Sequence, residues 1–146
     1  MVPAFNEDTS KAGIASIYAG EWQYMVGGGV AAFDCNGDSF PDLAMAGGEG
    51  VSSLYVNMSE HSGALHFAKQ ESGPELKNVT GFYPLDIDGD GLMDLVVLRV
   101  GEIVLLRGRG ACHFERANEL WNFNGGNAWW TSFSAPWEKG NKWPTL

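Results

Sequence analysis

Apolar residues in this chain occur in short runs separated by turn residues, without the spacing of an amphipathic helix. The clearest run, Leu-Val-Val-Leu at 95–98, is bounded by turn signals and predicts a strand buried on both faces. Glycine-containing turns at 100–102 and 108–110 predict antiparallel neighbours for this strand. We therefore expect an all-β fold. In this half of the chain, the expected strands lie at about 81–85, 94–99, 102–107 and 113–117.

The chain repeats itself with a period near 50 residues. The segment at 31–43 aligns with the segment at 83–95, an offset of 52 residues, and the segment at 63–67 aligns with that at 110–114. Four short antiparallel strands per repeat are typical of a propeller blade. We therefore predict a partial β-propeller with two full blades and part of a third. Its expected parts are an N-terminal lead-in at about 1–19, blades at about 20–70 and 71–120, and a degenerate repeat at about 121–146.

The third repeat lacks the acidic residues of the first two. Residues 137–146 align with 86–95, and the positions that carry side-chain oxygens in the earlier repeats are here Trp137, Lys139, Asn141 and Thr145. No cation is expected at this loop. Because a closed propeller needs at least about four blades, we expect this chain to be the N-terminal part of a longer protein. The remaining blades would then come from that longer chain or from an oligomer.

Two nine-residue windows, at 34–42 and 86–94, hold seven of the eighteen acidic residues. In each window, side-chain oxygens at positions 1, 3, 5 and 9 and the backbone carbonyl at position 7 would converge around a turn that the glycine at position 4 permits. Such an all-oxygen set predicts a hard divalent cation at each window. The candidate ligands are Asp34, Asn36, Asp38, Phe40 and Asp42 in the first window, and Asp86, Asp88, Asp90, Leu92 and Asp94 in the second.

Calcium suits these windows better than magnesium, because a flexible loop does not impose the strict octahedral geometry that magnesium requires. An EF-hand is excluded, since it needs a bidentate glutamate at position 12, where these windows have Met45 and Val97. The other interpretation of each window is a solvated turn, and the shared spacing and flanks of the two windows argue against it. The second window has four carboxylates and the first has three, so the second is predicted to bind calcium more tightly.

Charge and hydropathy exclude two classes of partner. The formal net charge of −9 argues against nucleic acid, whose phosphates need clustered Lys and Arg. No stretch approaches the roughly 20 apolar residues of a membrane span. The chain begins without the basic and apolar regions of a signal peptide, so the protein is either cytoplasmic or has lost a signal before this numbering begins.

The cysteines and tryptophans have competing interpretations. Cys35 aligns with Ile87 and Cys112 aligns with Leu65, so both cysteines are predicted to be buried small apolar side chains rather than a disulfide pair. The tryptophans after residue 120 could form a platform for a sugar or a partner. Packing between adjacent blades is the favoured interpretation. These residues are Trp121, Trp129, Trp130, Trp137 and Trp143.

The segments at 27–34, 36–43 and 54–57 together resemble an FG-GAP (VCBS-type) repeat, and 86–95 is a near-ideal version of its metal loop. The resemblance spans roughly residues 20–120, and within the superfamily the chain looks most like secreted bacterial proteins related to cartilage acidic protein. It implies a propeller of about seven blades, as in integrin α-subunit heads, with structural calcium in the loops. It also implies an extracellular or periplasmic location and a role in binding or adhesion more often than in catalysis.

We expect a non-enzymatic, calcium-stabilised segment of a secreted or cell-surface protein that binds a protein or glycan partner. The alternative is a propeller lyase or glycosidase, or an accessory domain attached to one. Such an enzyme would need a carboxylate pair or a Tyr/His site in the central channel. The sequence contains no Gly-x-Ser-x-Gly elbow, no His-Glu-x-x-His and no phosphate-binding glycine loop before a helix, so no catalytic residue is assigned.

Overall fold

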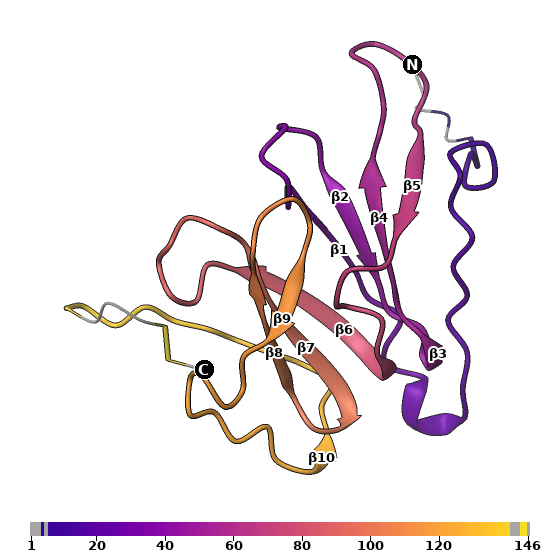
Figure 1. Cartoon of the computed structure of the whole chain (residues 1–146). Helices are drawn as coiled ribbons and strands as arrows, with labels where there is room; N and C mark the ends of the chain where they lie inside the picture. Colours follow the sequence, from indigo (N-terminus) through magenta and orange to yellow (C-terminus); the bar gives the residue numbers. More distant parts are fainter. Residues whose placement is uncertain (1–3, 5, 141–143, 146) are drawn as a thin grey trace.

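The computed structural model describes residue 4, residues 6–140 and residues 144–145. The fold is all-β and contains two sheets, neither of them closed, with one short 3₁₀ helix (η1, Trp22–Tyr24) before the first strand (Figure 1). The strands are β1 (Val30–Phe33), β2 (Asp42–Met45), β3 (Gly48–Val51), β4 (Ser53–Asn57), β5 (Phe67–Gln70), β6 (Lys77–Leu85), β7 (Asp94–Gly101), β8 (Val104–Gly108), β9 (Phe114–Arg116) and β10 (Ala128–Trp129).

Each repeat forms four antiparallel strands. The first sheet has the order β1-β2-β4-β5. The second contains β6-β7-β8-β9, with β3 on the free edge of β6 and β10 paired to the end of β7. The four strands expected between 81 and 117 are confirmed, and β6 begins four residues earlier than predicted, at Lys77. How many blades a complete protein would have stays a prediction.

The main hydrophobic core lies between the two sheets, where side chains of β1, β2 and β4 meet those of β6, β7, β8 and β9. Within β7, Leu95 and Val97 face this core, while Val96 and Leu98 join a second cluster on the opposite face. All four are fully buried, which confirms the prediction for this run. Each such side chain stabilises the fold by roughly 1.5–3 kcal/mol.

A largely irregular segment covers the outer face of each sheet, and the one on the second sheet includes the short strand β10 (Figure 1). On the first sheet, Ala12 packs with Tyr55 and Phe67, and the backbone N–H of Phe67 donates to the carbonyl of Ala12 at 2.7 Å. On the second sheet, the segment that follows β9 brings aromatic rings onto the face formed by Val96 and its neighbours. Its packed rings are Trp121, Phe123, Trp130 and Phe133.

Trp121 and Trp130 thus pack on the outer face of the second sheet, and packing of the tryptophans between adjacent blades stays a prediction. Trp129 and Trp137 are 41% and 54% exposed, and Trp143 lies outside the described residues. The third repeat can be followed only in part, because residues 141–143 and 146 also lie outside the described part of the chain. Among the described residues, no helix has both the length and the apolar character to span a membrane.

Candidate metal centre

The two acidic windows are the loops that join the first two strands of each sheet: loop 1 (34–42) connects β1 to β2, and loop 2 (86–94) connects β6 to β7 (Figure 1). The structure places eight of the ten predicted ligand residues in these loops, and Asp42 and Asp94 at the first positions of β2 and β7. The first aspartate of each loop organises its backbone. Asp34 accepts N–H donors from Gly37 at 2.7 Å and Ser39 at 2.8 Å, and Asp86 accepts the equivalent donors from Gly89 and Gly91.

The last aspartate of each loop is fully buried and ties its loop to a neighbouring strand. Asp42 accepts the backbone N–H of Cys35 at the start of loop 1 and that of Asn57 in β4, at 2.9 and 2.8 Å. Asp94 accepts the N–H groups of Ile87 and Gly108 at 2.7 and 2.8 Å. The two backbone hydrogen bonds to the last aspartate are thus the same in both loops.

Burial dominates the electrostatics of these two carboxyls. Loss of solvent raises the pKa of Asp42 and of Asp94, although two backbone N–H donors act to lower each pKa, and nearby aspartates raise it further. A raised pKa in the folded state means that keeping these groups ionised at neutral pH costs folding free energy. A cation beside either carboxylate would offset that cost.

The loops differ at positions 3 and 5. In loop 1, the Asn36 side-chain amide donates to Asp38 Oδ2 at 2.9 Å. In loop 2, both positions are aspartates, and Arg107 of β8 lies between them. At position 7, the backbone N–H groups of Phe40 and Leu92 donate to the position-5 carboxylates at 2.8 and 2.9 Å. Ligation through the position-7 carbonyls stays a prediction.

Loop 2 gathers its carboxylates as a cation site requires. One oxygen from each of Asp86, Asp88 and Asp94 lies within 4.8 Å of the others. The Oδ1 atom of Asp88 is buried and has no hydrogen-bond donor among the described residues. A buried carboxylate oxygen without a partner is costly unless a cation or water satisfies it. The residues present therefore fit a hard divalent cation at loop 2, with Asp86, Asp88 and Asp94 as its core.

Loop 1 presents a different cluster, formed by Cys35, Asp42 and Cys112. The two sulfur atoms are joined in a disulfide, so neither offers the thiolate that binds metals. The residues fit calcium less completely here, because Asp34, Asp38 and Asp42 are not gathered as closely as the carboxylates of loop 2. Loop 1 retains the same backbone hydrogen bonds, which hold its candidate ligands in the same order.

The disulfide corrects the prediction for the cysteines. Both are buried, as expected, but they are not independent small apolar side chains: Cys35 in loop 1 is bonded to Cys112 in the turn between β8 and β9, with a Cα–Cα distance of 4.7 Å. The backbone N–H of Cys112 also donates to the carbonyl of Cys35 at 3.1 Å. Alignment of the repeats shows which positions are buried, but not that these two meet across the interface between the sheets.

Arg107 is the residue of this centre that the sequence reasoning did not identify. It lies 13 residues beyond Asp94 and reaches loop 2 only because β7 and β8 form a hairpin. Its pKa is raised, first by the hydrogen bond to Asp90, so the guanidinium stays charged. The available signal was the basic residue at 107 within the apolar strand pattern of β8.

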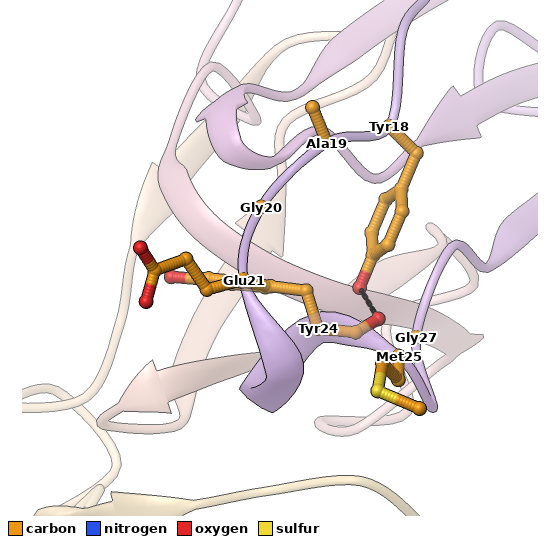
Figure 2. A pocket seen from close by; sticks show the side chains of 7 residues that line it. All are labelled: Tyr18, Ala19, Gly20, Glu21, Tyr24, Met25 and Gly27. Carbon is orange, nitrogen blue, oxygen red and sulfur yellow. Dashed lines mark hydrogen bonds between the residues drawn. The ribbon is translucent and has the colours of Figure 1, made fainter.

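A hollow of about 260 Å³ lies elsewhere, under the N-terminal segment (Figure 2). The Tyr18 hydroxyl donates to the Tyr24 carbonyl at 2.9 Å, and the Tyr24 hydroxyl donates to Asn78 Oδ1. Burial raises the pKa of both tyrosines, so both hydroxyls stay protonated and hydrogen-bonded. In Figure 2 the Glu21 carboxylate points away from the Tyr18–Tyr24 hydrogen bond. These contacts fix the N-terminal segment in place.

Comparison with known proteins supports the interpretation of the repeats. The family model described as an FG-GAP-like repeat matches residues 34–97. No curated protein and no solved structure matches the chain, so the closer resemblance to proteins related to cartilage acidic protein stays a prediction. The matched segment begins at the first residue of loop 1 and ends inside β7, so it contains both acidic loops. Residues 34–97 are therefore similar to an FG-GAP-like repeat, which supports the expected FG-GAP resemblance over this part of the chain.

Proposed function

We propose that this chain is a calcium-stabilised segment of a propeller-type FG-GAP protein, secreted or displayed on a cell surface. In this proposal calcium is structural, and the protein binds a protein or glycan partner. The observation that carries the proposal is the convergence of Asp86, Asp88 and Asp94 with an unsatisfied oxygen on Asp88. The duplicated hydrogen bonds of loop 1 support a second, weaker site of the same kind.

The residues of each loop prepare it for a cation. Asp34 and Asp86 hold the turn through backbone donors, and Asp42 and Asp94 connect the loop to the adjacent hairpin. When bound, calcium would supply the positive charge that clustered carboxylates lack. Because Asp94 contacts both loop 2 and β8, a cation at loop 2 would stabilise the contact between these elements.

The location and the partner are inferred from the family and the fold. A disulfide that joins two sheets is typical of proteins that fold in an oxidising compartment. FG-GAP repeats suggest a propeller-type segment, and the two face-packed sheets have the strand order of adjacent blades. Further blades, from a longer chain or an oligomer, would complete such a propeller and present the partner-binding surface.

Calorimetric titration and thermal unfolding in calcium, magnesium and EDTA test this proposal. We expect two equivalents of calcium and a calcium-selective rise in melting temperature. Replacement Asp88→Ala should remove one equivalent, because it deletes the carboxylate with the unsatisfied oxygen. The matched control is Asp8→Ala, which removes an exposed carboxylate paired only with Lys11 in a surface contact and should leave two equivalents.

Two results would overturn the proposal. One is the absence of both calcium heat and a calcium-dependent melting shift, which would make the loops solvated turns. The other is an unchanged stoichiometry in Asp88→Ala, which would place the bound calcium away from loop 2.

A further inference from the structure

A positively charged side chain, Arg107 of β8, lies against the carboxylates of loop 2. The Nε atom of Arg107 lies 2.8 Å from Asp88 Oδ2, and its Nη2 atom donates a hydrogen bond to Asp90 Oδ2 at 2.9 Å. The N–H direction at Nε does not meet hydrogen-bond geometry, so the contact with Asp88 is an ion pair. The Arg107 side chain is 27% exposed and that of Asp88 is 14% exposed. One guanidinium therefore bridges positions 3 and 5 of the loop from the neighbouring strand.

Loop 1 has no equivalent of this arginine. Leu43 pairs with Tyr55 across the first hairpin as Leu95 pairs with Leu106 across the second. The residue after Tyr55 is Val56, so a valine stands in the first repeat where Arg107 stands in the second. The bridging role in loop 1 falls to the uncharged Asn36 amide.

The arginine changes the charge comparison between the loops. Loop 1 has three carboxylates, a formal charge of −3. Loop 2 has four carboxylates and one guanidinium, so its formal charge of −4 becomes −3. The extra carboxylate, on which the predicted tighter binding at loop 2 was based, is therefore neutralised within the structure. The expected ranking of the two loops no longer follows from charge.

We propose that Arg107 is a resident counter-ion of loop 2, which holds Asp88 and Asp90 together without calcium and lowers the calcium affinity of that loop. The effect on calcium affinity rests on the proposed function, whereas the bridging of Asp88 and Asp90 by Arg107 does not. A divalent cation at Asp88 meets the repulsion of a fixed positive charge a few ångströms away.

Replacement Arg107→Gln tests the proposal, measured in an Asp38→Ala background so that loop 2 is the site observed. We expect a lower melting temperature in EDTA, because two adjacent carboxylates lose their shared counter-ion. We also expect calcium to bind roughly thirtyfold more tightly, the effect of removing one unit charge about 4 Å from a divalent ion in a well-solvated site. The matched control is Arg109→Gln, which removes the same charge two residues away from an exposed pair with Glu115 and should change neither measurement.

Weaker calcium binding in Arg107→Gln would overturn the proposal, because Arg107 would then be a support for the ligand Asp88. An EDTA melting temperature no lower than that of Arg109→Gln would also overturn it. If neither the parent nor Arg107→Gln binds calcium, the proposed function fails, while the EDTA measurement still decides whether Arg107 is the counter-ion.

Discussion

Each acidic loop needs a left-handed backbone at two positions, and the loops meet this need with different residues. Position 4 is glycine in both, with φ of 82° at Gly37 and 72° at Gly89. Position 6 is Gly91 in loop 2, with φ of 86°, but Ser39 in loop 1, with φ of 70°. Glycine adopts this region without the Cβ clash that other residues meet there. Loop 1 is therefore strained at a position where loop 2 is not.

Replacement Ser39→Gly should stabilise the protein by about 0.5–1 kcal/mol. It relieves roughly 1–2 kcal/mol of left-handed strain, and glycine gives back about 0.4–1 kcal/mol through greater freedom in the unfolded chain. The Ser39 N–H that donates to Asp34 is retained. Denaturant unfolding measures the change, and the reciprocal Gly91→Ser should destabilise by a similar amount. A destabilised Ser39→Gly would show that the serine hydroxyl has a role that outweighs the strain.

At the residue scale, the features that could be predicted were those set by residues close together in the sequence. The spacing of Asp86, Asp88 and Asp94 was sufficient to predict their convergence, because a tight turn alternates its side chains. Arg107 and the pairing of Cys35 with Cys112 depend on contacts between distant strands and between sheets. No spacing rule within one repeat contains that information, so the arginine was missed and the cysteines were assigned incorrectly.

At the scale of elements, the disulfide links loop 1 of the first sheet covalently to the turn between β8 and β9 of the second sheet. It closes a sequence separation of 77 residues, and the rings of Phe33 and Phe114 pack beside it at 6.2 Å between centroids. Loop 1 is thus fixed from two directions: by Asp42 to β4 within its own sheet, and by Cys35 to the turn before β9 in the other. Loop 2 has only the first of these attachments, since Ile87 replaces the cysteine.

The double replacement Cys35→Ala with Cys112→Ala should destabilise the protein by roughly 2–4 kcal/mol, since a cross-link over a long loop restricts the unfolded chain. Because loop 1 would also lose its attachment to the second sheet, hydrogen exchange should rise at residues 34–42 and not at 86–94. A reducing agent should produce the same changes in the parent protein and none in the variant. Equal exchange increases in both loops would mean that the disulfide stabilises the fold without ordering loop 1.

The strands themselves were largely predictable, and the exceptions have a physical reason. β7 and β8 carry the apolar runs that a buried strand requires. β3 has the sequence Gly-Glu-Gly-Val and joins the second sheet by pairing with β6 through a shifted register. Such a short, glycine-rich segment has no alternating pattern, and its position depends on the long β6 edge. β10, with two residues, is likewise defined by its partner β7.

At the scale of the whole molecule, the two sheets form a unit with both outer faces covered. The N-terminal segment contributes Ala12 to the face of Tyr55 and Phe67, and the Ala15 N–H donates to the Tyr55 hydroxyl at 3.1 Å. Leu43 and Met45 pack against the same cluster. A sheet face this apolar would otherwise be a site of self-association. The segment before η1 covers this face, and we predict that it limits face-to-face association of the first sheet.

Replacement Ala12→Glu tests this role, because a carboxylate cannot be buried against Tyr55 and Phe67 without a large desolvation cost. We expect the N-terminal segment to leave the sheet, hydrogen exchange to rise at 8–19 and at Phe67, and a concentration-dependent dimer to form in light scattering. Ala15→Glu places the same charge at an exposed position of the same segment and should leave the association state of the parent protein unchanged. Release of the segment without self-association would show that the first sheet does not need a cover, and that the segment stabilises the monomer by packing alone.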